Sequence, residues 1–159
     1  MKRVYIAIGS NLNNPLKQVI GAIKKIKNLS DTNFIKSSSF YRSKPMGRIL
    51  DQPDYLNAVV SIDTDLSPDI LLEYMHFFEF LHGRIRTFKW ASRNLDLDIL
   101  LYDNEIIQTK RLTIPHYGIK KRSFVLYPLF EIEPNLCFPD GELLSSRIKK
   151  VLMNDLTLW

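Results

Sequence analysis

The order of hydrophobic periods along this chain of 159 residues limits its fold more than any other sequence feature. Alternating apolar residues predict strands, and apolar residues that recur every three to four positions predict helices. The sequence therefore predicts strand, helix, strand, strand, helix and strand at residues 4–8, 15–27, 34–42, 55–62, 68–81 and 96–101. This order matches the ferredoxin-like split βαβ arrangement, an α/β (α+β) fold whose helices pack on one face of a mostly antiparallel sheet. The other face is then open to ligands or to C-terminal additions.

Capping residues and apolar stripes define the two helices. Asn14 before Pro15 and Ser67 before Pro68 are typical helix starts. The helical period selects Leu16, Val19, Ile20, Ile23 and Ile26 in the first helix, and Ile70, Leu71, Tyr74, Met75, Phe78 and Leu81 in the second. Beyond residue 101 the pattern predicts a short strand at 106–107, an extended segment at 111–117, a short helix at 122–130 interrupted by Pro128, and a terminal helix at 142–152.

Composition limits the class of protein. The length suits one domain, residues 1–159. A net charge of +5 and a pI of about 9.3 favour anionic partners, although lysines scattered over a surface give the same values. The single Cys137 excludes an internal disulfide and fits a reducing cytosol, and its apolar neighbours predict a small buried hydrophobe. No segment approaches the roughly 20 apolar residues of a membrane span, so we expect a cytoplasmic protein without a membrane partner.

Residues 83–100 place cations directly before a strand that carries two aspartates. The strand period sends Asp96 and Asp98 to one face, and it sends Leu95, Leu97, Ile99 and Leu101 to a face that a core could bury. Neighbouring carboxylates repel each other unless a cation or a shared proton relieves them. The preceding cations are Arg84, Arg86, Lys89 and Arg93. Carboxylates beside such cations indicate a Mg²⁺-phosphate site, and the alternative is a salt-bridged surface loop beside an ordinary strand.

Two other polar groups accompany this stretch. Glu73, His76 and Glu79 share a helix face; they form either an ordinary polar face or, for Glu79, a contact to a ligand at the cation loop. A second basic cluster contains Arg111, Thr113, His116, Tyr117 and Arg122, and taken alone it favours a surface location. The six glycines form neither a P-loop nor a Rossmann turn, so any nucleotide phosphates would have to be held by arginines and metal.

Several motifs in chain order resemble the family of 6-hydroxymethyl-7,8-dihydropterin pyrophosphokinase, an enzyme of folate biosynthesis. The signature of that family resembles residues 89–100 (KWASRNLDLDIL). Further matches are residues 8–12 (IGSNL), 39–42 (SFYR), 51–58 (DQPDYLNA), 111–117 (RLTIPHY), 128–132 (PLFEI) and 138–141 (FPDG). The departures are a loop at 86–90 that is one residue shorter, Lys89 where arginine can occur, Ser43-Lys44 in place of a Thr-Pro pair, and His76 in place of glutamine.

The resemblance implies a ferredoxin-like fold and Mg²⁺-dependent transfer of pyrophosphate from ATP to the pterin hydroxymethyl group, with release of AMP. It implies that Asp96 and Asp98 hold two Mg²⁺ ions, with Arg84 and Arg93 at the phosphate chain. It implies pterin contacts by Ser43, Lys44, Met46, Tyr55, Asn57, Asp96 and Phe124. It also implies ATP contacts by Glu79, Arg84, Arg86, Trp90, Arg93, Ile99, Arg111, Thr113, His116, Tyr117 and Arg122.

Two alternative functions are compatible with the same fold. A single-stranded RNA-binding module would need an aromatic-rich Lys/Arg-Gly-Phe/Tyr segment on a central strand, which the sequence lacks, and it would leave Asp96 and Asp98 unexplained. Another Mg²⁺-dependent nucleotide transferase would differ only in its substrate. We therefore predict an ATP-dependent enzyme of small molecules that is a monomer and has no nucleic-acid partner.

Overall fold

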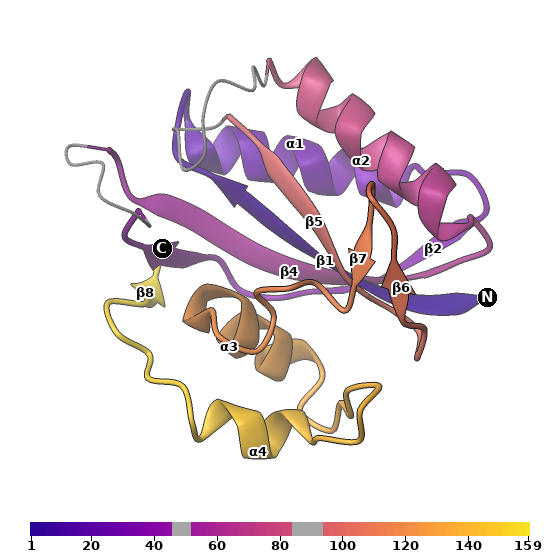
Figure 1. Cartoon of the computed structure of the whole chain (residues 1–159). Helices are drawn as coiled ribbons and strands as arrows, with labels where there is room; N and C mark the ends of the chain where they lie inside the picture. Colours follow the sequence, from indigo (N-terminus) through magenta and orange to yellow (C-terminus); the bar gives the residue numbers. More distant parts are fainter. Residues whose placement is uncertain (46–51, 84–93) are drawn as a thin grey trace.

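The structure is a computed structural model that describes residues 1–45, 52–83 and 94–159. These residues form a six-stranded antiparallel sheet of order β5-β1-β4-β3-β8, in which β2 also pairs with β4, and a separate β6-β7 hairpin (Figure 1). The elements are β1 (Lys2–Ser10), α1 (Pro15–Lys27), β2 (Thr32–Ser37), β3 (Tyr41–Ser43), β4 (Tyr55–Thr64), α2 (Pro68–Leu81), β5 (Asp96–Tyr102), β6 (Ile107–Gln108), β7 (Thr113–Ile114), α3 (Ser123–Ile132), α4 (Leu144–Ile148) and β8 (Thr157–Leu158). The predicted fold class is confirmed.

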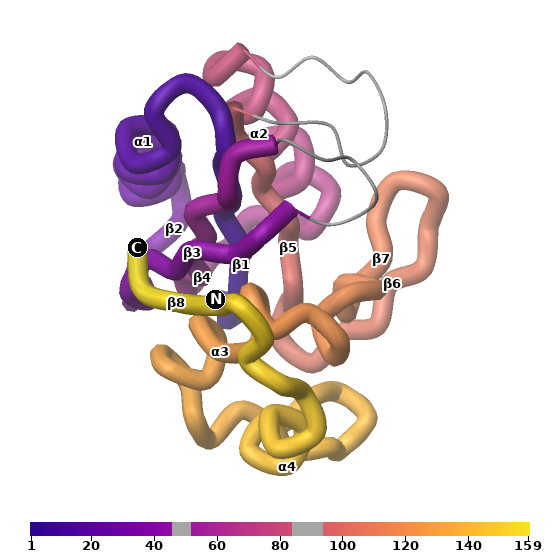
Figure 2. The backbone as a smooth tube through the Cα atoms, turned by 90° about the vertical axis from the view of Figure 1, so that its left-hand side faces the viewer, coloured from indigo at the N-terminus to yellow at the C-terminus, as the bar shows by residue number. Residues whose placement is uncertain are grey.

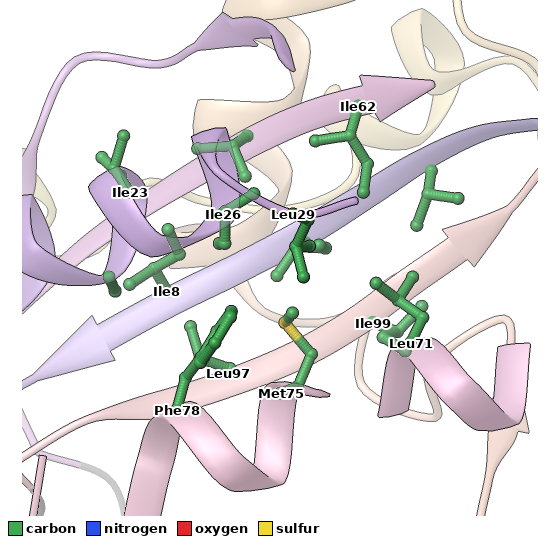
Figure 3. Packing of buried hydrophobic residues seen from close by; sticks show 14 of the residues in the cluster. Ile8, Ile23, Ile26, Leu29, Ile62, Leu71, Met75, Phe78, Leu97 and Ile99 are labelled. Atoms are coloured by element: carbon green, nitrogen blue, oxygen red, sulfur yellow. The ribbon is translucent and has the colours of Figure 1, made fainter. Parts of the chain in front are cut away.

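The sheet separates two hydrophobic cores. On one face α1 and α2 pack against alternate residues of the central strands, including Val60 and Ile62 of β4. Figure 3 shows Ile26, Met75 and Phe78 of the two helices directed toward the strands. On the other face α3 and α4 pack against the intervening residues, such as Val59, as C-terminal additions to the split βαβ unit. The strand expected at residues 55–62 is therefore confirmed, and its alternate side chains lie on opposite faces of the sheet.

Both predicted helix starts are present. The side chain of Asn14 accepts a hydrogen bond from the backbone N–H of Lys17, and Ser67 accepts one from Ile70, which satisfies amides that have no partner within the helix. The predicted apolar stripes are wrong at Leu16, Ile20, Ile70 and Leu81, which are exposed, and Ala22 and Leu72 are buried in their place. The helical period alone therefore does not determine which face of each helix packs against the sheet.

A β-bulge in β5 changes the facing of its last residues. Ile99 pairs with Ile6 of β1, but Leu101 pairs with Tyr5, so Leu100 is an extra residue in β5. Leu101 consequently lies in the α3 core, whereas Leu97 and Ile99 lie in the α1–α2 core. The prediction that Leu101 shares their face is wrong, because an inserted residue reverses the alternation after it.

Four predicted elements differ in their limits. The strand expected at residues 34–42 is two strands, β2 and β3, and between them Ser38 exchanges hydrogen bonds with the backbone of Val59. Helix α3 continues past Pro128 to Ile132, and α4 covers only Leu144–Ile148 of the helix expected at 142–152. The strand expected at 106–107 is β6, one residue further along the chain.

Cys137 does not lie in the core, contrary to the prediction. Its side chain is exposed, whereas Leu136 and Phe138 on either side are buried. Residue 137 forms an isolated antiparallel bridge with Leu143, and in extended backbone alternate side chains point to opposite sides. Among the helices that the structure describes, none combines the length and the apolar character needed to cross a lipid bilayer.

Candidate active site

A cavity of about 440 Å³ wraps around the outer edge of β5. Its walls come from α2 on one face of the sheet, from α3 on the other, and from the β6–β7 hairpin. Every predicted site residue in the described part of the chain lines this cavity: Ser43, Lys44, Tyr55, Asn57, Glu79, Asp96, Asp98, Ile99, Arg111, Thr113, His116, Tyr117, Arg122 and Phe124. The predicted site residues Met46, Arg84, Arg86, Trp90 and Arg93, together with Lys89, lie outside the described residues.

The two carboxylates lie on the same face of β5, as predicted. Asp96 pairs with Gly9 of β1 and Asp98 pairs with Ala7, which packs with the α3 core. Both aspartates are partly exposed, and Leu97 between them is buried on the opposite face. The small side chains opposite them on β1 leave the carboxylates open to the cavity.

His116 faces Asp98 as a neutral hydrogen-bond donor. Its Nε2 lies 3.7 Å from Oδ2 of Asp98, and its Nδ1 accepts a hydrogen bond of 3.1 Å from the backbone N–H of Gly118. A neutral ring with an accepting Nδ1 carries its proton on Nε2. Burial lowers the pKa of His116 to about 4, and the nearby positive charge of Arg122 acts in the same direction, whereas Asp96 opposes it. The backbone N–H of His116 also donates to the carbonyl of Leu100, the bulge residue of β5.

Arg122 is held in place by aromatic rings and by a glycine. Its guanidinium lies 5.1 Å from the ring centroid of Tyr117 and 5.8 Å from that of Phe124, and its Nη2 donates to the hydroxyl of Tyr117. A Cβ atom on Gly118 would come within 2.4 Å of Nε of Arg122. Glycine at position 118 therefore lets the arginine lie close over the turn.

The end of the cavity formed by β3 and β4 has a buried amide, and two aromatic side chains also line the cavity. Asn57 is 5% exposed, and its Nδ2 donates a hydrogen bond of 2.7 Å to the hydroxyl of Ser43. Tyr55 pairs with Ser43 across β3 and β4, and Phe124 enters from the first turn of α3. This end can receive a flat, polar-edged ring.

Glu79 supports the strand that carries the aspartates. Its carboxylate is 3% exposed, and Oε2 accepts a hydrogen bond of 2.9 Å from the backbone N–H of Leu97. Among the strands that the structure describes, β5 is the edge of the sheet, so this amide has no partner from those strands on that side. The helical spacing placed Glu79 near the site, but the bond to the residue between Asp96 and Asp98 was not predictable from sequence.

Sequence reasoning missed Lys110 of the site, and it did not predict a contact between residues 82 and 94, which lie outside the cavity lining. Lys110 lines the cavity, and only its position beside Arg111 could have indicated it. Asn94 donates a hydrogen bond of 2.7 Å to the carbonyl of His82 and accepts one of 2.8 Å from Asn13, so residues 82 and 94 are tied together. Gly83 adopts a φ of +81° at this point, which favours glycine. No sequence period connects these positions, which the fold brings together.

Carboxylates beside cationic side chains, with aromatic residues in the same cavity, are typical of enzymes that transfer phosphate groups with the help of a metal ion. Comparisons with known proteins define this class further. Residues 5–134 match the family model described as 7,8-dihydro-6-hydroxymethylpterin-pyrophosphokinase (HPPK). The 2-amino-4-hydroxy-6-hydroxymethyldihydropteridine pyrophosphokinase of Haemophilus influenzae is 51% identical over 150 residues, which cover 94% of this chain and 93% of that protein. The protein of that name from Pseudomonas aeruginosa is 42% identical and covers 89% of this chain and 86% of its own.

The chain belongs to the HPPK family and is a pyrophosphokinase of folate biosynthesis. The predicted family, enzyme and pathway are thereby confirmed, and ATP is the substrate that the family implies. Solved structures of Plasmodium falciparum HPPK-DHPS match the fold: one has a TM-score of 0.74 at 13% identity and covers 94% of this chain and 41% of that chain.

Proposed function

We propose that ATP binds along β5 and the β6–β7 hairpin, and that the pterin binds at the Asn57 end of the same cavity. One observation carries this proposal: all described residues of the predicted metal, ATP and pterin sets line a single cavity. Sets of residues that are far apart in sequence would not share one cavity if they served unrelated surface roles. The hydroxymethyl group of the pterin would then meet the phosphate chain beside Asp96 and Asp98.

We propose that these two aspartates hold two Mg²⁺ ions. Within residues 1–45, 52–83 and 94–159, no group of three or more histidine, cysteine or acidic side chains could hold a metal ion. Two partly exposed carboxylates nevertheless suit Mg²⁺, which is usually bound by one or two carboxylates together with waters and substrate phosphates. When bound, Mg²⁺ would neutralise the phosphate charge and orient the phosphate chain.

In the proposed reaction the hydroxymethyl oxygen attacks the β-phosphorus of ATP, and AMP is the leaving group. Nε2–H of His116 would donate a hydrogen bond to a phosphate oxygen, and Arg111 and Arg122 would place positive charge beside the phosphate chain. With a pKa lowered to about 4, His116 remains neutral near pH 7 and is a weak base. The residues therefore bind and orient the reactants, His116 does not act as the general base, and the proton of the attacking hydroxyl group is released to solvent.

The pterin end would select its ligand by shape and by fixed hydrogen bonds. Tyr55 and Phe124 would pack against the flat pterin ring. Aromatic rings prefer offset-stacked or edge-to-face contacts with one another. The bond from Asn57 to Ser43 fixes the amide orientation before a ligand arrives, and this reduces the entropy lost on binding. Lys44 follows Ser43 along the same wall. A single domain of residues 1–159, a monomeric state and a cytoplasmic location remain predictions that accompany this proposal.

The test is the rate of AMP release from ATP, with and without the hydroxymethyl-dihydropterin, at saturating Mg²⁺. Asp96→Asn and Asp98→Asn should each lower the rate at least about 100-fold, comparable to the loss of one transition-state contact. Asp103→Asn is the matched control, since its side chain just beyond β5 is 47% exposed and pairs with Lys2 outside the cavity. Near-normal rates in either site variant, or AMP release that is independent of the pterin, would contradict the proposal.

A further inference from the structure

Strand β3, which leads into the pterin end of the cavity, is short and lies between two strands. It contains only Tyr41–Ser43, and it pairs with β4 on one side and with β8 on the other. Figure 2 shows the end of the chain running from α4 to lie along β3. Without β8, this three-residue strand would form the edge of the sheet, where strands fray most readily.

The last residue of the chain makes two contacts with the β3 segment. The backbone N–H of Trp159 donates a hydrogen bond of 2.9 Å to the carbonyl of Phe40. The guanidinium carbon of Arg42 lies 4.0 Å from the centroid of the Trp159 ring, which is a close cation–π contact. Arg42 also approaches Asp54, with 3.9 Å between Nη1 and Oδ2. Arg42 thus connects residue 159 to the residue directly before β4.

These contacts adjoin the pterin end of the cavity. Ser43 follows Arg42 directly and Tyr55 follows Asp54 directly, and the two residues pair across β3 and β4. Both line the cavity, and Ser43 accepts the hydrogen bond from the buried amide of Asn57. Any loosening of β3 would move the acceptor that orients Asn57. In the sheet, β1 and β4 lie between β3, which makes the contact with Trp159, and β5, which belongs to the proposed ATP end of the cavity.

We infer that Trp159, with β8, is a positioning element for the pterin subsite and acts through Arg42 and β3. This inference rests on the proposed placement of the pterin. The region that matches the family model ends at residue 134, so β8 and Trp159 lie beyond it. In addition to its two strand partners, the β3 segment is held by Glu131 of α3, whose carboxylate accepts hydrogen bonds from the hydroxyl groups of Ser39 and Tyr41. Trp159 adds a further attachment, which leaves the strand with little freedom.

The test compares Trp159→Ala with Trp159→Phe and with Leu158→Ser. Trp159→Phe keeps an aromatic ring that can contact Arg42. Leu158→Ser is the control for β8, because Leu158 is 69% exposed and its replacement leaves the pairing of β8 with β3 intact. Trp159→Ala should raise the KM for the pterin about threefold, as expected for loss of one partly exposed cation–π contact, with kcat and the KM for ATP unchanged. Trp159→Phe should restore most of the difference, and Leu158→Ser should match the wild type.

Hydrogen exchange of the peptide covering residues 40–45 gives a readout that does not depend on turnover. Trp159→Ala should speed exchange there about threefold, and Leu158→Ser should not. Unchanged exchange, or equal changes in the KM values for pterin and ATP, would overturn the inference. Wild-type protein that releases no AMP in the presence of the pterin would instead refute the proposed function, and the exchange rates would still decide whether Trp159 holds β3.

Discussion

Replacement of Glu79 tests whether this buried carboxylate supports the strand that carries Asp96 and Asp98. In the structure Glu79 accepts the backbone N–H of Leu97 at 2.9 Å and is 3% exposed. Glu79→Ala removes this acceptor, and a buried donor without a partner costs about 1–3 kcal/mol of the free energy of unfolding. Glu79→Gln keeps an acceptor oxygen but loses the charge, so it should cost about 1 kcal/mol.

Urea unfolding of the apoprotein measures both variants, and Glu73→Ala is the matched control on the same helix. Glu73 is 58% exposed and its ion pair with Arg111 is 3.7 Å long, so its loss should cost at most about 1 kcal/mol. The Mg²⁺ concentration needed for half-maximal AMP release should rise in Glu79→Ala and less in Glu79→Gln, because a displaced Leu97 moves both neighbouring aspartates. Equal stability of the alanine and glutamine variants would refute the role of the hydrogen bond.

Three further predictions concern single residues of the cavity. Because the pKa of His116 is lowered from 6.5 to about 4, its neutral form stabilises the fold above pH 6.5, and this stability is lost as the pH falls toward 4. In urea unfolding of the apoprotein, His116 should contribute about 2 kcal/mol to the loss of stability between pH 7 and pH 5, in addition to His82, whose pKa is also lowered. His116→Gln should therefore reduce the difference between the two pH values by about 2 kcal/mol, and an unchanged difference would contradict this role. Gly118→Ala should displace Arg122 and raise the KM for ATP about tenfold. The KM for the pterin should change less, because Arg122 contacts the pterin end only through the ring of Phe124. Equal KM values for ATP in variant and wild type would show that the turn does not hold Arg122. Asn57→Ala should weaken pterin binding about tenfold in a direct titration and leave ATP binding unaltered, since the amide is fixed on Ser43 at the pterin end.

Local sequence signals predicted those parts of the fold that depend on neighbouring residues. Asn14 and Ser67 begin their helices as expected, because a capping side chain bonds amides only three residues away. The alternation of β4 was predictable for the same reason, since it is a property of extended backbone. The bulge at Leu100 and the outward direction of Cys137 were not, because pairing with β1 and with Leu143 determines them.

The composition of the site was predictable from motifs, but its geometry was not. The resemblance to the family implied that His116 and Glu79 are site residues, and both line the cavity. The tautomer of His116 depends on the N–H of Gly118, and the bond from Glu79 reaches across 18 positions to Leu97. Trp159, which contacts Arg42, lies outside every matched motif. Such contacts arise only when the chain folds, and no local period encodes them.

The most direct test of the account is a count of bound metal ions in the absence of turnover. Mn²⁺ can replace Mg²⁺ at carboxylate sites, and its electron paramagnetic resonance signal reports free ion. In the complex with a non-hydrolysable ATP analogue and the pterin, the wild-type chain should bind two Mn²⁺ ions, as proposed for Asp96 and Asp98. Asp96→Asn and Asp98→Asn should each bind fewer, or bind them at least about tenfold more weakly. Unchanged Mn²⁺ binding in both variants would contradict the claim that the β5 aspartates hold the metal ions.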